Sequence, residues 1–103
     1  MVPPRTLDEV AHHIDMDKEQ LITEGVLALL ISKKNELLNE KLELLKRYKV
    51  TSFEFLKEKI QKGEIKEHPA WEDYIEEKNI DAEIKVIERD IKAIRKTHSG
   101  ISR

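Results

Sequence analysis

The sequence predicts an all-α fold in which two long helices form an antiparallel hairpin. A short helix precedes the hairpin, a small helix lies at its bend, and the protein is expected to be dimeric. Charged residues and hydrophobic residues each make up 39% of the 103 residues, with three Gly and three Pro. Abundant Lys, Glu, Leu and Ile with few helix breakers are typical of long helices. Apolar residues also recur at intervals of three and four, which is the helical period.

An N-terminal arm with one short helix is expected over residues 1–16. Thr6 stands three residues before Glu9, which is the spacing of a capping box at a helix start. The short helix should therefore occupy residues 7–14.

The first long helix of the hairpin is expected over residues 18–48. Asp17, followed by Gln20 three residues later, is an N-cap signature at its start. Gly25 lies inside this helix and costs about 1 kcal/mol relative to Ala. Two heptad-spaced apolar rows make a face broad enough for more than one neighbouring helix. These rows are Leu30, Leu37 and Leu44, and Ile31, Leu38 and Leu45.

A small helix is expected over residues 52–62, at the bend of the hairpin. Thr51 and Glu54 have the capping-box spacing, and Gly63 is a suitable residue just beyond the end. The buried face of this helix should consist of Phe53, Leu56 and Ile60.

The last helix is expected over residues 69–96. Pro69 fits its first position, because the N–H group that proline lacks would have no partner there. Isoleucines follow at spacings of four and three, which is typical of a coiled-coil stripe. The stripe consists of Ile80, Ile84, Ile87, Ile91 and Ile94. The hairpin then spans residues 17–97, and residues 98–103 are expected to form a flexible tail.

Blocks of opposite charge orient the two long helices. Residues 1–32 carry a net charge of −4, residues 33–49 of +3, residues 64–83 of −6 and residues 84–103 of +4. An antiparallel arrangement places each acidic block against a basic one, whereas a parallel arrangement would oppose like charges. Exposed ion pairs contribute only about 0–1 kcal/mol each, so this pattern selects orientation more than it adds stability. The basic end of the last helix also complements the helix dipole.

The residue types give no support for catalysis, a metal site or a cofactor. The three glycines are isolated, so no Gly-rich phosphate loop is present, and no nucleophile lies beside a candidate base. The absence of cysteine excludes disulfides and thiolate metal sites. His12 and His13 are adjacent and point about 100° apart on a helix, which suits chelation poorly. We therefore expect a protein that is not an enzyme.

Composition also bears on location and ligands. The longest apolar run, Gly25–Ile31, is far shorter than a membrane span, and the N-terminus has no apolar signal-peptide segment. We therefore expect a cytoplasmic protein that does not enter membranes. Enrichment in Lys, Glu and Ile favours a thermophilic source. The net charge of −2 argues against general attraction to nucleic acid.

All five aromatic residues lie between residues 48 and 74, which is the bend of the expected hairpin. Trp71 is expected to fill the wide end of the hairpin, where three helices diverge. The alternative is that Trp71 anchors a partner protein. The candidate cluster for partner binding, or for supporting the bend, consists of Phe53, Phe55, Trp71 and Tyr74.

A two-helix hairpin buries little surface for its size, and the broad leucine face needs another partner. We therefore expect a homodimer or an obligate complex. The dimer or helix-packing face should be built from the two leucine-rich rows and the isoleucine stripe.

Three segments carry a resemblance to a known class of proteins. LDEVAHHIDMDKEQLITEGVLALL, at residues 7–30, resembles the two helices of ribbon-helix-helix proteins. RYKVTSFEFLKEKIQKGEI and HPAWEDYIEEKN follow at residues 47–65 and 68–79. With all three, the chain resembles small archaeal antitoxins of type II toxin–antitoxin pairs. The resemblance implies a non-catalytic protein that dimerises and holds a toxin, often a ribonuclease encoded nearby, inactive.

The resemblance departs from its pattern at the N-terminus. Ribbon-helix-helix proteins read DNA with a strand before the first helix, and here that place holds Met-Val-Pro-Pro-Arg. Two prolines cannot donate the hydrogen bonds that a ribbon needs. The alternatives are a structural helical homodimer or adaptor without a toxin, and a DNA-binding regulator that acts through the first two helices.

Overall fold

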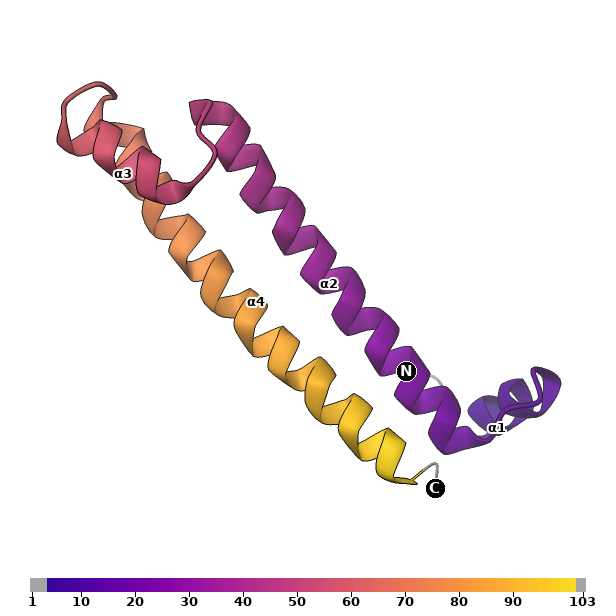
Figure 1. Cartoon of the computed structure of the whole chain (residues 1–103). Helices are drawn as coiled ribbons and strands as arrows, with labels where there is room; N and C mark the ends of the chain where they lie inside the picture. The colour runs from indigo at the N-terminus through magenta and orange to yellow at the C-terminus, as the bar shows by residue number, and fades with distance from the viewer. Residues whose placement is uncertain (1–3, 102–103) are drawn as a thin grey trace.

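The computed structural model describes residues 4–101, and within them it contains helices and no strand (Figure 1). The helices are α1 (Pro4–His13), α2 (Lys18–Tyr48), α3 (Phe53–Gln61) and α4 (Glu67–Ile101). α2 and α4 run antiparallel along the length of the molecule, α3 packs on the first part of α4, and α1 lies beside the start of α2 (Figure 1). The predicted all-α hairpin is therefore confirmed.

The start of α2 and both ends of α3 follow from local sequence signals. The carboxylate of Asp17 accepts a hydrogen bond of 2.8 Å from the Gln20 N–H, as predicted. At α3 the cap is Ser52, one residue later than Thr51, and its hydroxyl oxygen accepts from the Phe55 N–H at 3.3 Å. Gly63 follows α3 with a φ of 76°, a left-handed conformation that glycine adopts without strain.

Two helices extend further than predicted. α1 begins at Pro4, three residues before the expected start, so Thr6 lies inside the helix. Proline is compatible with a first turn because the N–H groups there have no intrahelical partner. α4 continues to Ile101, five residues beyond the predicted end at residue 96, so residues 98–101 of the expected tail are helical, while residues 102–103 lie outside the described part. The lone Gly100 does not end the helix.

The start of α4 contains one interruption. His68 has extended backbone angles, φ −113° and ψ 130°, so regular helix begins after it. Pro69 therefore stands where the sequence predicted the helix to start.

The core runs along the seam between α2 and α4 and widens under α3. Leu56 and Ala70 are fully buried where α3 meets α4. The remaining core residues are Leu37, Leu44, Phe53, Ile60, Tyr74, Ile80, Ile84, Ile87 and Ile91. Leu30, Leu45 and Ile94 are partly buried.

The two apolar rows of α2 do not lie in one interface. The row of Leu30, Leu37 and Leu44 faces α4, whereas Ile31 and Leu38 are each 37% exposed. The broad face predicted from the sequence is thus only half covered within one chain.

The predicted pairing of acidic and basic blocks between the long helices is realised at one end. Arg47 pairs with Asp73 at 3.0 Å, and Lys41 pairs with Asp81 at 2.8 Å. These contacts join the basic block of α2 to the acidic block of α4, as predicted. Among the described residues, however, no ion pair joins the acidic residues before position 33 to the basic end of α4. The cations at that end of α4 are thus not neutralised as the charge blocks had suggested.

Candidate functional site

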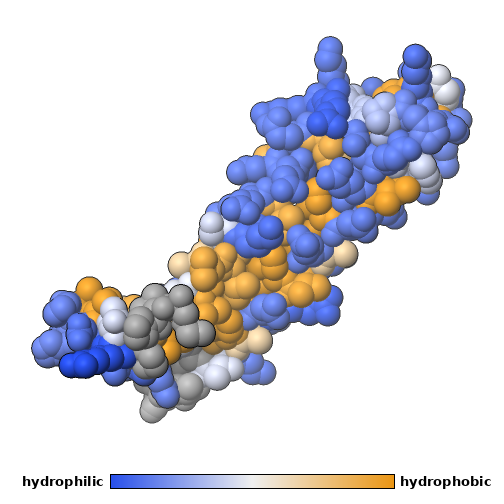
Figure 2. Space-filling model, turned by 180° about the vertical axis from the view of Figure 1, so that it is seen from behind, coloured by the Kyte–Doolittle hydropathy of each residue, from blue (hydrophilic) through white to orange (hydrophobic). Residues whose placement is uncertain are grey.

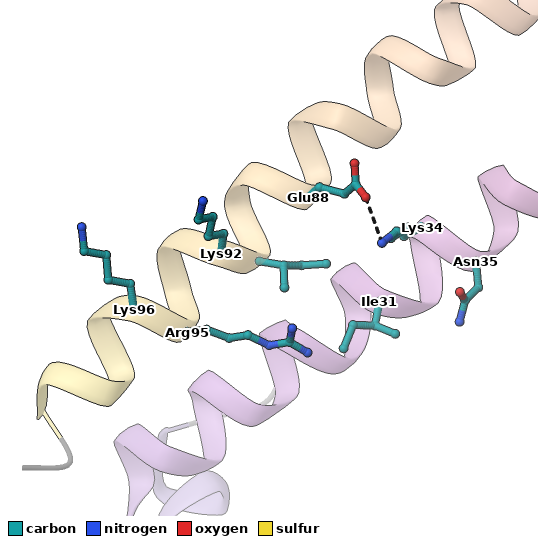
Figure 3. Close-up of a pocket in the computed structure, with 8 residues that line it drawn as sticks. Ile31, Lys34, Asn35, Glu88, Lys92, Arg95 and Lys96 are labelled. Carbon is teal, nitrogen blue, oxygen red and sulfur yellow. Dashed lines mark ion pairs between the residues drawn. The ribbon is translucent and has the colours of Figure 1, made fainter.

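A groove opens between α2 and α4 in the half of the molecule near α1 (Figure 3). Its volume is about 680 Å³, which lies in the usual range of ligand sites. The lining residues are Ile31, Lys34 and Asn35 from α2, and Glu88, Ile91, Lys92, Arg95 and Lys96 from α4. The groove therefore combines an apolar floor, formed by two isoleucines, with a predominantly basic rim.

Helical spacing explains why these residues meet. Residues three, four, seven and eight apart lie on one side of an α-helix, and the α4 contributors from Glu88 to Lys96 have these spacings. On α2, Ile31, Lys34 and Asn35 share a side in the same way. The antiparallel packing of α2 and α4 then faces the two sets toward each other.

The groove is lined by more positive than negative charges. Lys34 Nζ lies 3.1 Å from Glu88 Oε2, so this pair is neutralised across the two helices (Figure 3). Lys92, Arg95 and Lys96 make no ion pair with any residue of the described part. Three exposed cations thus line the groove without a negative partner, and an anionic or acidic ligand would supply one. Arg95 extends toward α2, whereas Lys92 and Lys96 extend outward from α4 (Figure 3).

Apolar surface continues from the groove along α2. Asn35, Leu38 and Leu42 follow Ile31 at spacings of four, three and four, which keeps them on one side of the helix. Leu38 is 37% and Leu42 is 52% exposed. The stripe from Ile31 to Leu42 is roughly 16 Å long, or three helical turns.

A second set of polar contacts holds the helices together beyond the groove. Tyr48 donates a hydrogen bond to Asp73, which also pairs with Arg47, and burial raises the pKa of Tyr48 to about 12. Next to them, burial raises the pKa of Glu77 to about 7. The hydrogen bond to Asp81 raises the pKa of Lys41 above its usual value. These groups fix the register of α2 against α4 and therefore position the groove.

The predicted aromatic cluster divides into buried and exposed members. Phe53 and Tyr74 are 5% and 8% exposed and belong to the core. Phe55 and Trp71 are 53% and 39% exposed, so neither fills the core. The expectation that Trp71 fills the wide end of the hairpin is wrong, because Ala70 and Leu56 already close the contact between α3 and α4.

Trp71 instead covers the outside of the bend. Its ring stacks on Tyr74 with 5.3 Å between ring centroids and an interplanar angle of 20°. On the same helix, the Lys78 ammonium lies 5.4 Å from the centroid of the Tyr74 ring, within the range of a cation–π contact. The alternative, in which Trp71 anchors a partner, stays a prediction.

The groove was not predicted from the sequence. The basic end of α4 was instead expected to complement the helix dipole and to pair with the acidic start of the chain. The signal that could have found the site was the +4 net charge of residues 84–103 together with isoleucines at the same spacing as the cations. In the described residues, no group of three or more potential metal ligands is present, and no helix is long and apolar enough to span a membrane.

Comparison with known proteins places the chain in one family. The sequence model of the uncharacterized protein MJ0235 family matches residues 1–99. The chain belongs to this family. No curated protein and no solved structure matches it. The resemblance to antitoxins therefore stays a prediction.

Proposed function

We propose that this chain is a non-catalytic protein–protein interaction module, and that its groove binds an acidic amphipathic helix of a partner protein. The observation that carries the proposal is the apolar floor of Ile31 and Ile91 in a groove lined by three cations that lack a negative partner. A helix with an apolar face and flanking carboxylates would cover the two isoleucines and pair with the cations at the same time.

The apolar stripe supports a protein ligand over a nucleic acid. Phosphates would use Lys92, Arg95 and Lys96 but would leave Ile31, Leu38 and Leu42 in water. A helix laid along the stripe would cover these side chains with anchors at the same three- and four-residue spacings. A toxin that presents such a helix is one partner of this kind, which keeps the antitoxin-like function within the proposal.

The proposal is tested with synthetic helical peptides of about 18 residues, which span about 27 Å. One labelled peptide carries a leucine face flanked by Glu, and a second carries the same face flanked by Lys. Fluorescence anisotropy should show binding of the acidic peptide at micromolar concentration and much weaker binding of the basic one. A labelled DNA duplex serves as a third ligand.

Charge-reversal variants locate the binding. The double substitution Lys92→Glu with Arg95→Glu should weaken acidic-peptide binding about tenfold or more, because two attractive contacts of up to about 1 kcal/mol each are replaced by repulsive ones. A matched control is Lys62→Glu with Lys66→Glu, two exposed cations at the opposite end of the molecule. Equal effects of the two pairs would contradict the groove, and preferential binding of the duplex would favour the DNA-binding alternative.

A further inference from the structure

A second exposed apolar row runs along the first half of α2. It consists of Ile22, Val26 and Leu29, which are 45%, 38% and 73% exposed. Spacings of four and three place the three side chains on one face of the helix. Leu29 is the most exposed of the large apolar residues in the described part of the chain. This row is therefore apolar surface that the described part of the chain leaves uncovered.

This row lies on the opposite side of α2 from the groove. Ile22, Val26 and Leu29 stand nine residues before Ile31, Asn35 and Leu38, respectively. Nine residues are two and a half turns of an α-helix, so each pair points in opposite directions. Viewed from behind, the molecule shows apolar side chains gathered over α2 and α4 in the half near α1 (Figure 2).

The chain exposes more surface than a compact monomer of its mass. The chain exposes 8039 Å², whereas a compact monomer of 12.1 kDa would expose roughly 6,000 Å². The excess of roughly 2,000 Å² per chain is more than the roughly 800 Å² that each partner buries in a standard interface. Its extents of 61 × 28 × 17 Å show the cause, because the hairpin is one helix layer thick over much of its length.

The charges that flank the row make it complementary to itself. Glu19 stands seven residues before Val26, and Lys33 stands seven residues after it. If two α2 helices cross antiparallel at Val26, Glu19 lies opposite Lys33 of the second copy, and Ile22 lies within one residue, about 1.5 Å along the axis, of the position opposite Leu29. A parallel crossing would place like charges together. Lys33 is only weakly engaged in its own chain, at 3.8 Å from Glu36, with more than half of each side chain exposed.

We infer that a second copy of this chain covers the row of Ile22, Val26 and Leu29, with the two α2 helices antiparallel about a two-fold axis at Val26. Such an interface is isologous, so every contact occurs twice and the assembly closes as a dimer. The groove on the other side of α2 stays open in this dimer. The interface is thus independent of the proposed function, and each dimer would present two grooves.

Engineered cysteines test the axis directly, because the chain contains no cysteine of its own. At a two-fold axis Val26→Cys meets its own copy, and a disulfide forms where the Cα atoms approach within about 4.4–6.8 Å. Leu42→Cys is the matched control, since Leu42 is 52% exposed on the other side of α2. Mild oxidation of the full-length variants at micromolar concentration should give a covalent dimer for Val26→Cys and little for Leu42→Cys. Equal rates would overturn the proposed axis.

Exchanging the charges of Glu19 and Lys33 tests the dimer interface independently, with the dissociation constant measured by sedimentation equilibrium. Glu19→Lys and Lys33→Glu should each weaken the dimer by about tenfold, since each creates two like-charge contacts of up to about 1 kcal/mol. The double variant should recover the wild-type dissociation constant, and circular dichroism should show unchanged helix content throughout. A wild-type chain that is monomeric at micromolar concentration, or a double variant no tighter than the single ones, overturns the inference.

Discussion

Glu77 Oε1 lies 3.6 Å from Lys41 Nζ, on a side chain that is only 3% exposed. This oxygen is buried and accepts no hydrogen bond from any residue of the described part. Lys41 gives its hydrogen bond to Asp81 instead, at 2.8 Å. Burial therefore dominates at Glu77 and raises its pKa from 4.5 to about 7. A buried carboxyl that prefers its neutral form makes the seam between α2 and α4 sensitive to pH.

The sign of the pH dependence follows from this shift. A carboxyl whose pKa is raised by folding stabilises the folded state fully below its unfolded pKa of 4.5, and that contribution is lost as the pH rises through about 7. We expect the melting temperature to fall between about pH 5 and pH 8. Glu77→Gln, which stays neutral, should remove this decline. Thermal melts followed by circular dichroism across that range provide the measurement.

Two carboxyl groups near Glu77 could also change the pH profile, and the test distinguishes both from Glu77. The hydrogen bond and charge of Lys41 lower the pKa of Asp81 despite its partial burial, so its contribution is lost only as the pH falls, in a separate and more acidic window. Glu76 is an exposed neighbour, and Glu76→Gln is therefore the control. A pH profile that is as steep in Glu77→Gln as in the wild type would contradict the assignment.

Truncating the aromatic residues should separate core from surface. Phe53→Ala removes a ring that is 5% exposed and should destabilise the protein by about 3 kcal/mol or more. Trp71 is 39% exposed and stacked on Tyr74, so Trp71→Ala should cost about 1 kcal/mol and leave the helix content unchanged. Urea denaturation at one fixed chain concentration measures both. Unfolding of the Trp71 variant would show that the ring is part of the core.

Helix positions were predictable because they depend on local signals. Asp17 caps α2 and Gly63 follows α3, and each signal acts within four residues of the chain. The isoleucine stripe of α4 was predictable for the same reason, since its period alone defines a buried face. The choice of Ser52 over Thr51 was not, because adjacent hydroxyl residues offer the same cap.

The groove and the place of Trp71 depend on contacts between distant segments. The seven-residue spacing of Ile31 and Leu38 places both on one side of α2. Only the register of α2 on α4 decides that this side lies outside the seam between the two helices. Side-chain size suggested Trp71 for the bend, whereas Ala70 allows the closer approach of α3 and α4. The sequence therefore predicted which elements form, and the packing decided which residues remain available to a partner.

Two glycines should respond in opposite ways to alanine. A Cβ added at Gly25 would have no atom within 4 Å, and Gly25 lies inside α2, so Gly25→Ala should stabilise the protein by about 0.5–1 kcal/mol. Gly63 has a φ of 76°, which strains any other residue, so Gly63→Ala should destabilise by about 1 kcal/mol. Urea midpoints compare the two. A destabilised Gly25 variant would indicate that a partner approaches α2 closely at this position.

At the end of α2 the reverse substitution, of another residue by glycine, can be tested. Lys49 follows the helix with a φ of 53° and a ψ of 43°, the left-handed conformation that usually selects glycine. The N–H of Lys49 donates to the Lys46 carbonyl, and the N–H of Val50 donates to the Leu45 carbonyl, both at 3.1 Å. The helix end is thus closed by the hydrogen bonds of a Schellman motif, without the residue that fits it best.

Lys49→Gly should therefore raise the free energy of unfolding. Relief of the left-handed conformation contributes about 1–2 kcal/mol, and the greater freedom of glycine in the unfolded chain offsets about 0.5–1 kcal/mol of it. The expected net gain is about 0.5–1 kcal/mol, measured by urea denaturation at fixed chain concentration. Lys49→Ala is the control, because it removes the charge and keeps the Cβ. A gain in the alanine variant equal to that in the glycine variant would assign the effect to charge and contradict the backbone explanation.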